Sequence, residues 1–468
     1  MMQAKFKKNL FAAVVILVAV LAGPPHRAGD AAAENGEPPT KSLPSAVMME
    51  NNGAFSLERC IEIALDKNPE IAASKWDIAA ADARHDAARS AFWPQISVEG
   101  GYQRYVDSQR LIAARYNGEV GVFDDDILRG DLIAKINLYA GGRMMNEASA
   151  AGKLSAAEKK KFVRTRDELI YSVAGIYFSI LGQQRIIASL AFSQQALDEN
   201  LKRTTQLYDA RKVARVDVLR TEVRLTDLQQ NLIREKNALA VQRRILFSLM
   251  GYDIVPDNAR FEDNLEFSNK TSFSQGGLID TAIKNRPDFL AAKERVDAQI
   301  MKVSAARAAY WPNVNLVGTY GVRNAPSPSD VGRNTQSTED VGSVGLVLSI
   351  PIFDGGQISA KVREEMAALA AAQARLKKLE LQIRQETETA SLDVLSSAER
   401  VKATATVIDQ ARESFRIESL KYEMGKGSLT DVLDAHSAQL QAETTYYRAL
   451  TDYHTAMARL RLATGENI

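Results

Sequence analysis

Cysteine is almost missing from this chain of 468 residues, which contains only Cys60. One cysteine cannot form a disulfide within the chain. Recognisable catalytic patterns are missing as well, because the sequence contains no nucleophile elbow, phosphate loop or zinc-binding pattern. The four histidines also lack the spacing of metal ligands. We therefore expect no enzyme activity, no cofactor and no metal.

Long apolar runs are missing after residue 22, so no transmembrane helix is predicted beyond it. The earlier run, Leu10–Ala22, follows a basic start at residues 5–8 and is typical of a secretory signal. A retained membrane anchor is the alternative, and the short run argues against it. We expect cleavage after Ala22 or Ala33. Residues 1–33 hold four of the 59 basic and one of the 58 acidic residues, so the mature chain is slightly acidic, which argues against a nucleic-acid partner.

Proline is absent between Pro94 and Pro256 and again after Pro351. Because proline breaks helix interiors, both stretches have room for long helices. Apolar residues recur at three-and-four spacing from Ile358 to Ile408, as in coiled-coil packing. A helix from residue 356 to 422 would be ~100 Å long at a rise of ~1.5 Å per residue.

The chain contains one pattern twice. The copies lie 218 residues apart up to the Trp-Pro motif and 214 apart from the Gly-Gly motif onward. A period this long is too large for a solenoid repeat and indicates a duplicated half-molecule. The matching segments include Trp93-Pro94 with Trp311-Pro312, Gly141-Gly142 with Gly355-Gly356, Tyr208 with Tyr422, and Asp217-Val218-Leu219 with Asp431-Val432-Leu433.

Between Trp-Pro and Gly-Gly in each copy, the apolar period changes from 3.6 to 2, which indicates strands. Leu132, Ala134 and Ile136, for example, alternate with Lys135 and Asn137. Each predicted strand has about the length that a tilted membrane strand needs. A soluble four-stranded sheet is the alternative.

Four membrane strands would require several chains. A sheet in lipid must close, because an open edge leaves backbone groups without hydrogen bonds in hydrocarbon. Membrane barrels have about eight strands or more, so four cannot close alone. Two chains would give a filled barrel of eight strands, whereas three would give twelve strands and a passage.

The predicted fold class is therefore mixed but mainly α, with long helical hairpins that form a tube and four membrane strands per chain that three chains would join into one 12-stranded β-barrel. Each half should hold short helices, two strands and one long helical hairpin. The predicted boundaries are a signal at 1–33, a linker at 34–54, a first half at 55–251, a connector at 252–276 and a second half at 277–466. The first half contains strands 95–106 and 127–139 and the hairpin 142–250. The second half contains strands 312–323 and 341–352 and the hairpin 356–464.

Several short motifs occur in order along residues 55–466, most of them in duplicate. They are Asn68-Pro69-Glu70 and Arg286-Pro287-Asp288, the two Trp-Pro pairs, Ile350–Gly356, Tyr422-x-x-Gly425, Thr430–Ala435 and Leu462–Gly465. With these motifs the chain resembles the TolC family of outer-membrane efflux proteins.

The resemblance implies a homotrimer in the outer membrane of a Gram-negative bacterium, in contact with its lipid. It places the shared 12-stranded β-barrel in that membrane and a trimeric helical barrel in the periplasm. It also implies docking to a periplasmic adaptor protein and, through it, to an inner-membrane transporter of the RND or ABC class. The implied function is an exit duct for efflux or type I secretion. A soluble periplasmic coiled-coil scaffold is the alternative, which the alternating strands disfavour. The sequence does not identify the cargo.

Two groups of candidate residues lie where the long hairpins turn. Lys212, Val213, Ala214 and Arg215 in the first turn, and Gly425, Lys426, Gly427, Ser428 and Leu429 in the second, are the expected adaptor-docking residues, with Lys426 and Leu429 exposed. Arg211 stands where the family commonly has glycine, which leaves the shape of the first turn open.

The second group would form a gate at the periplasmic aperture. Asp431 and Asp434 share a helix face, and three chains would bring six carboxylates around one axis; ordinary helix capping is the alternative. Asp217 and Arg220 would either lock neighbouring hairpins or form a pair within one helix. By analogy with family gates, Tyr422 would hydrogen-bond to Asp217, and a packed aromatic ring is the alternative.

Overall fold

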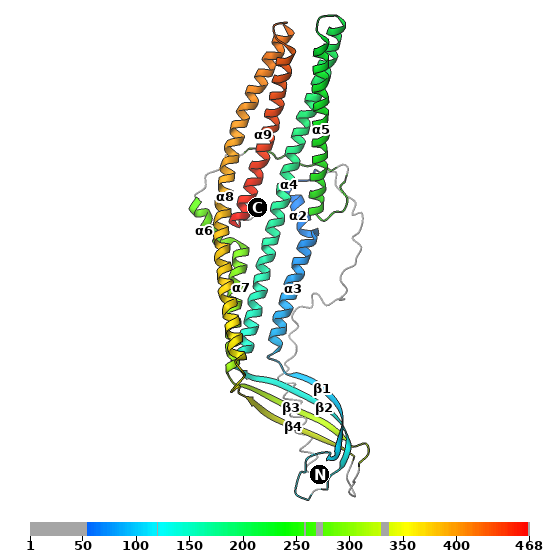
Figure 1. The fold of residues 1–468 in the computed structure, drawn as a ribbon, viewed down its shortest axis with the longest axis vertical. Helices are drawn as coiled ribbons and strands as arrows, with labels where there is room; N and C mark the ends of the chain where they lie inside the picture. Colours follow the sequence, from blue (N-terminus) through cyan, green and yellow to red (C-terminus); the bar gives the residue numbers. More distant parts are fainter. Residues whose placement is uncertain (1–53, 119, 257–258, 268–274, 329–336, 467–468) are drawn as a thin grey trace. The chain divides into compact units, whose positions relative to one another are not determined.

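The computed structural model describes residues 54–118, 120–256, 259–267, 275–328 and 337–466 (Figure 1). The predicted signal and the linker before residue 54 lie outside these ranges. The described chain forms two compact units, and both halves of the duplication contribute to each. Unit 1 comprises residues 80–155 and 295–373, and unit 2 comprises residues 54–79, 156–294 and 374–466.

Unit 1 contains a sheet of four antiparallel strands in the order β1-β2-β3-β4. The strands are β1 (Gln95–Arg110), β2 (Phe123–Ala140), β3 (Asn313–Asn324) and β4 (Thr338–Ser349). The two strands of the first half extend several residues beyond the predicted loop boundary, because Gln109 and Arg110 pair with Asp124 and Phe123 past a register shift. The four predicted strands are thus confirmed, and the structure shows that they pair antiparallel.

The register gives the sheet one apolar face. Val98 pairs with Leu132, which pairs with Tyr320 on the next strand, and Leu316 pairs with Leu346. Paired residues point to the same side, so these side chains form one surface. No described residue of unit 1 covers it, and its large apolar residues stay exposed: Ile96, Val98, Tyr102, Leu128, Leu132, Tyr320, Val344, Leu346 and Leu348.

The opposite face of the sheet is more polar, although Val341 and Val347 on it are apolar and exposed. Arg323 Nη1 lies 2.6 Å from Asp131 Oδ1, and the Thr319 and Ser343 hydroxyls are 2.8 Å apart. Gly321 is needed beside Asp131, because a Cβ built there would lie 2.1 Å from Asp131 Oδ1. The missing side chain therefore lets the carboxylate lie against the sheet, within reach of Arg323.

The helices repeat in the two halves. Among the described residues, no helix is both long enough and apolar enough to cross a membrane. In the first half they are α2 (Leu57–Lys67), α3 (Pro69–Ser90), α4 (Arg143–Asp209) and α5 (Arg215–Leu249); in the second they are α6 (Gln275–Asn285), α7 (Pro287–Arg307), α8 (Gln357–Glu423) and α9 (Leu429–Thr464), with a short 3-10 turn at Ala308–Tyr310.

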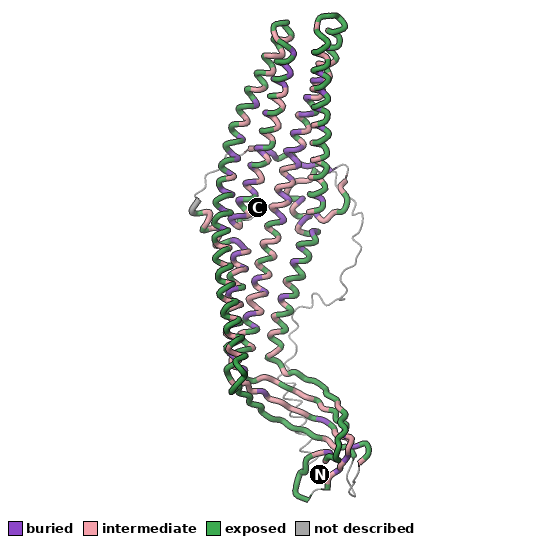
Figure 2. The backbone as a smooth tube through the Cα atoms, in the orientation of Figure 1, coloured by how far each residue is buried: buried purple, intermediate pink, exposed green. Residues whose placement is uncertain are grey.

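The main core lies in unit 2, where helices of both halves pack together (Figure 2). Tyr177 of α4 is fully buried, and its hydroxyl donates to the carbonyl oxygens of Phe55 (3.0 Å) and Glu262 (2.8 Å). Phe261 and Leu265 of the connector are buried in the same core. The described part of the connector is therefore a packed segment, although its sequence shows no periodicity.

Each pair of short helices meets at a buried polar residue, Asn68 in the first half and Arg286 in the second. Arg286 is only 2% exposed. Its guanidinium donates to both carboxylate oxygens of Asp288, at 3.1 and 2.7 Å, and to Glu386 Oε2 at 2.7 Å. Burial by itself would raise the pKa of Asp288, but the hydrogen-bonded Arg286 lowers it below its usual value.

We expect Arg286→Met to destabilise the protein by about 3 kcal/mol, because it leaves two carboxylates without their buried partner. A lowered folded-state pKa stabilises above the unfolded pKa, and that contribution is lost as the pH falls through the folded value. The gap in melting temperature between wild type and variant should therefore shrink from pH 7 to pH 3 in circular dichroism. Arg59→Met, which breaks an exposed pair, is the matched control with a small expected effect. A gap that is equal at both pH values would contradict this account.

Candidate functional site

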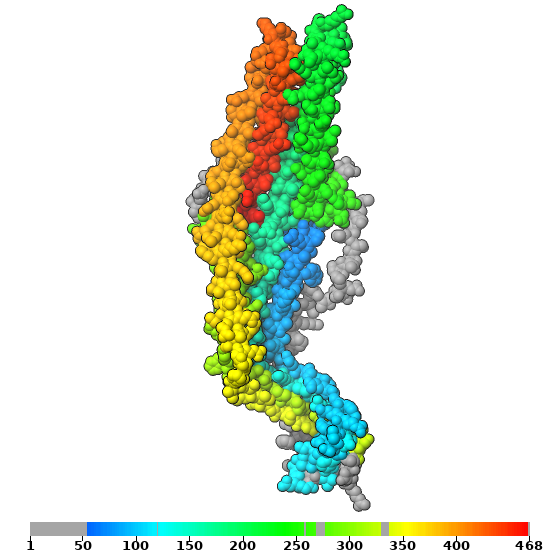
Figure 3. All heavy atoms as spheres, viewed as in Figure 1, coloured from blue at the N-terminus to red at the C-terminus, as the bar shows by residue number. Residues whose placement is uncertain are grey.

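The two hairpin turns, between α4 and α5 and between α8 and α9, lie side by side at one end of unit 2 (Figures 1 and 3). They have the same backbone. The Arg211 N–H donates to Tyr208 O and the Lys212 N–H to Leu207 O, and the equivalent bonds join Gly425 to Tyr422 and Lys426 to Lys421. This pair of bonds is the Schellman motif that ends many helices.

The first turn keeps this shape without glycine. Arg211 has φ +57°, and Gly425 at the equivalent position has φ +72°. Arg211 is the only described non-glycine residue with positive φ. The left-handed conformation costs an L-residue with a Cβ roughly 1–2 kcal/mol, so the first turn is strained where the second is not.

We expect Arg211→Gly to tighten the first turn by about 1 kcal/mol, because glycine adopts this φ without strain. Amide hydrogen exchange of the turn peptides, followed by mass spectrometry, would slow about fivefold for such a gain. Ala210→Gly is the control, since residue 210 has no positive φ and glycine there only adds chain entropy. The interpretation fails if both variants loosen the turn equally.

The second turn has a cap that the first lacks. The Ser428 side chain accepts from the Asp431 N–H at 3.2 Å, and the Ser428 N–H donates back to Asp431 Oδ2 at 3.4 Å. This reciprocal arrangement is a capping box. Ala214, the equivalent of Ser428, offers no side-chain cap. The capping interpretation of Asp431 is thus confirmed, and whether it also belongs to a ring of carboxylates stays a prediction.

Polar contacts join the two hairpins near their turns. Arg203 Nη1 lies 3.4 Å from Glu423 Oε1, and Arg224 Nη2 lies 3.5 Å from Asp434 Oδ1. Arg220 Nη1 donates to Thr430 Oγ1 at 3.1 Å. In each contact, the basic group comes from the first half and the acceptor from the second. All are exposed, so each contributes only ~0.2–1 kcal/mol.

These contacts correct the expected pair of Asp217 and Arg220. No ion pair joins the two within the described residues, because Arg220 reaches across to Thr430 instead. Arg224, the partner of Asp434, was not among the candidates. The sequence contained a signal for this contact. Arg220 and Arg224 are four residues apart and share one helix face, and Thr430 and Asp434 do the same on the other hairpin.

The expected hydrogen bond from Tyr422 to Asp217 is not formed. The Tyr422 hydroxyl is buried without a partner at full hydrogen-bond geometry, although the Thr204 side chain approaches it. Burial first, and the nearby charge of Asp217 second, raise the pKa of Tyr422. Its ring packs against a cluster that includes Leu433, so Tyr422 is a packed aromatic residue.

Leu429 was expected to be exposed, and this is wrong. It is 5% exposed and packs with Leu433 and residues of the first hairpin. As the first residue of α9, it faces the neighbouring helices, which a turn motif alone does not reveal. The exposed apolar residue at this turn is Met424, at 63%.

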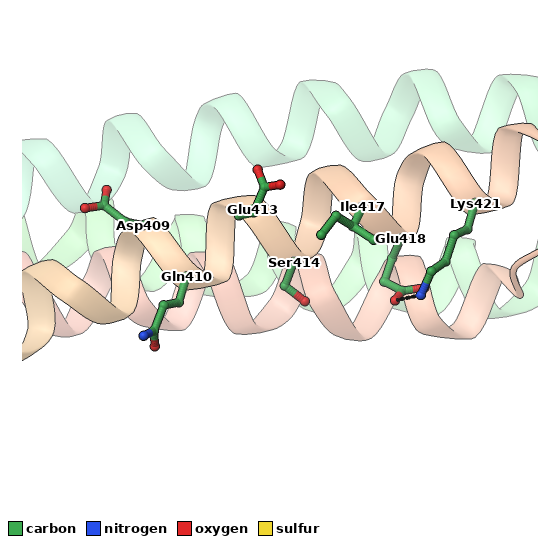
Figure 4. Close-up of a pocket in the computed structure, with 7 residues that line it drawn as sticks. All are labelled: Asp409, Gln410, Glu413, Ser414, Ile417, Glu418 and Lys421. Carbon is green, nitrogen blue, oxygen red and sulfur yellow. Dashed lines mark hydrogen bonds and ion pairs between the residues drawn. The ribbon is translucent and has the colours of Figure 1, made fainter.

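Two further features near the turns offer no cargo site. A surface hollow of about 670 Å³ beside α8 is lined by side chains of that helix alone, and Glu418 and Lys421 within it form an ion pair (Figure 4). His436 is buried against Phe415, and this burial lowers its pKa. Among the described residues, no cluster of three or more potential metal ligands occurs.

An amphipathic sheet and long duplicated helical hairpins define the fold of an outer-membrane channel. The crystal structure of the outer membrane protein VceC from Vibrio cholerae has this fold, with a TM-score of 0.72 and 18% identity, over 88% of this chain and 96% of that one. The Campylobacter jejuni CmeC outer membrane channel has a TM-score of 0.75 and 16% identity, over 87% and 85% of the two chains.

The family model described as outer membrane efflux protein matches residues 60–252 and 278–466. The chain therefore belongs to the outer membrane efflux protein family, and it is an exit duct of the outer membrane. Among curated proteins, it is 23% identical to the outer membrane protein TolC of Vibrio cholerae, over 91% of this chain and 92% of that protein. It is also 23% identical to the alkaline protease secretion protein AprF of Pseudomonas aeruginosa, over 65% and 63%.

Proposed function

We propose that three copies of this chain assemble into one duct with a shared barrel of twelve strands. The observation that carries the proposal is the sheet of unit 1, which has an apolar face, a polar face and two edge strands, β1 and β4. In hydrocarbon, each unpaired backbone group costs several kcal/mol, so both edges need strands from other copies. Three copies leave a passage lined by the polar face.

The residues at the helix-proximal ends of the strands support a membrane boundary there. Trp93 and Trp311 precede β1 and β3, and Phe353 follows β4; all three side chains are exposed. Large aromatic residues are enriched where a membrane protein crosses from hydrocarbon to water. Apolar and aromatic exposure together fit a sheet surrounded by outer-membrane lipid.

The lipid-facing assignment is tested by neighbouring residues on opposite faces. Val344→Lys places a charge on the apolar face, at a cost of about 2–4 kcal/mol in mid-membrane, whereas Ser343→Lys places it in the passage. We expect Val344→Lys to be lost from the urea-washed outer-membrane fraction and Ser343→Lys to remain there with altered conductance. A soluble scaffold would tolerate both changes, so equal behaviour of the variants would refute the proposal.

The helical hairpins would form the periplasmic tube. Val216, Leu219 and Val223 of α5 are exposed at three-and-four spacing, and Ile417 and Leu420 of α8 are also exposed. Such stripes cover one helix face and are suited to packing against another helix. We assign them to contacts between neighbouring copies in the trimer.

The duct would work passively and contain no catalytic step. Its turns would contact a periplasmic adaptor, which connects it to an inner-membrane RND or ABC transporter. The docking set comprises Lys212, Val213, Ala214 and Arg215 in the first turn and Met424, Gly425, Lys426, Gly427 and Ser428 in the second. Leu429 is omitted because it is buried.

The aperture would lie at the same end. Asp434 is exposed and close to Arg224, and Asp431 is exposed one turn earlier on α9. In a trimer, three copies of each would focus a negative field on the axis, where multivalent cations would bind. The contacts of Arg220 and Arg224 across the hairpins would hold this aperture closed.

We expect Asp434→Asn to weaken the block of single-channel conductance by trivalent cations, because it removes three charges from the aperture. It should also raise the open probability, since Arg224 loses its partner. Asp227→Asn, an exposed aspartate of α5 in the first hairpin without a described ion pair, is the control. If Asp434→Asn leaves block and open probability as in wild type, Asp434 does not line the aperture.

A further inference from the structure

The first hairpin turn has three basic side chains without partners. Arg211, Lys212 and Arg215 are exposed, and within the described residues none of them makes an ion pair. The neighbouring arginines 203, 220 and 224, in contrast, all contact the second hairpin. The three turn cations are therefore not used to hold the hairpins together.

The second turn does not repeat this charge. The positions equivalent to Arg211, Lys212 and Arg215 hold Gly425, Lys426 and the buried Leu429. The two turns thus share a backbone but differ in chemistry, with three exposed cations on one and a single cation beside the exposed Met424 on the other.

The backbone conformation of Arg211 indicates that the charge of the first turn has a function. It occupies a left-handed position where glycine would avoid a cost of roughly 1–2 kcal/mol. Strained residues of this kind occur where the side chain or the shape is needed. The shape needs no arginine, because Gly425 forms the same turn. What Arg211 adds is its guanidinium, which is suited to binding carboxylates with two hydrogen bonds.

We propose that the first turn is a docking site for a carboxylate-rich segment of the protein partner that meets the hairpin turns. The inference rests on the proposed function, in which these turns contact a periplasmic adaptor. Arg211, Lys212 and Arg215 pair with acidic side chains of that segment, whereas the second turn offers the apolar Met424. In a trimer, the acidic contact therefore repeats at every other turn, with threefold symmetry.

The test uses the full-length protein in detergent and a synthetic antiparallel helical hairpin with glutamates in its turn. Its twin carries glutamines instead. At low salt we expect the glutamate hairpin to bind about tenfold more tightly, and the difference to vanish in 0.5 M salt. Arg211→Gly should reduce the preference without loosening the turn, and Arg211→Gly/Lys212→Gln/Arg215→Gln should abolish it.

Lys236→Gln is the matched control, because Lys236 is an exposed cation of α5 outside the turn, and it should keep the full preference. Equal binding of the two hairpins to wild type would overturn the proposal, as would a preference that survives the triple variant. Tighter binding to phosphatidylglycerol vesicles than to the glutamate hairpin would overturn it in favour of a lipid surface. Wild-type conductance in planar bilayers is recorded from the same preparation. Normal conductance without a glutamate preference refutes only the docking chemistry, whereas absent conductance refutes the proposed trimeric assembly.

Discussion

The two unpaired edges of the four-stranded sheet are the constraint on which the rest of this protein depends. One chain presents apolar side chains on one face and a polar network on the other, but it cannot close the sheet around a passage. Lipid does not hydrogen-bond to a free edge. In the proposed assembly, strands of other copies complete the barrel, and the long helices follow the same symmetry.

Because the chain is duplicated, its two hairpin turns have the same backbone but carry different side chains. Both turns have the same hydrogen bonds, so the ends of both hairpins have the same shape. The side chains have diverged: the first hairpin supplies arginines, and the second supplies acceptors such as Glu423 and Asp434. Two identical copies would place like charges opposite each other. Divergence makes the two hairpins of one chain complementary, and each exposed contact contributes little energy.

Buried residues are not distributed evenly along the helices of unit 2. The large, fully buried residues, such as Tyr177 and Phe247, concentrate in the middle of unit 2. Near the turns, the buried residues form a separate, smaller cluster that is rich in leucine, and exposed ion pairs lie near it. Local opening costs least where few apolar contacts are lost. This distribution of buried residues is consistent with the proposed opening at the turns.

The sequence by itself determined the duplicated plan, the long hairpins, the alternating strands and the family. These features depend on local periodicity, on proline and glycine positions and on short motifs, all of which can be read along the chain. Strand ends were less accurate, since β2 begins at Phe123 rather than at residue 127. Only the tertiary structure decided the partners of the turn residues. Leu429 is buried, Arg220 contacts Thr430, and Tyr422 packs in a core, because the register between helices far apart in sequence sets these contacts. A residue's own helix fixes the direction of its side chain, but the neighbouring helix determines what it meets there.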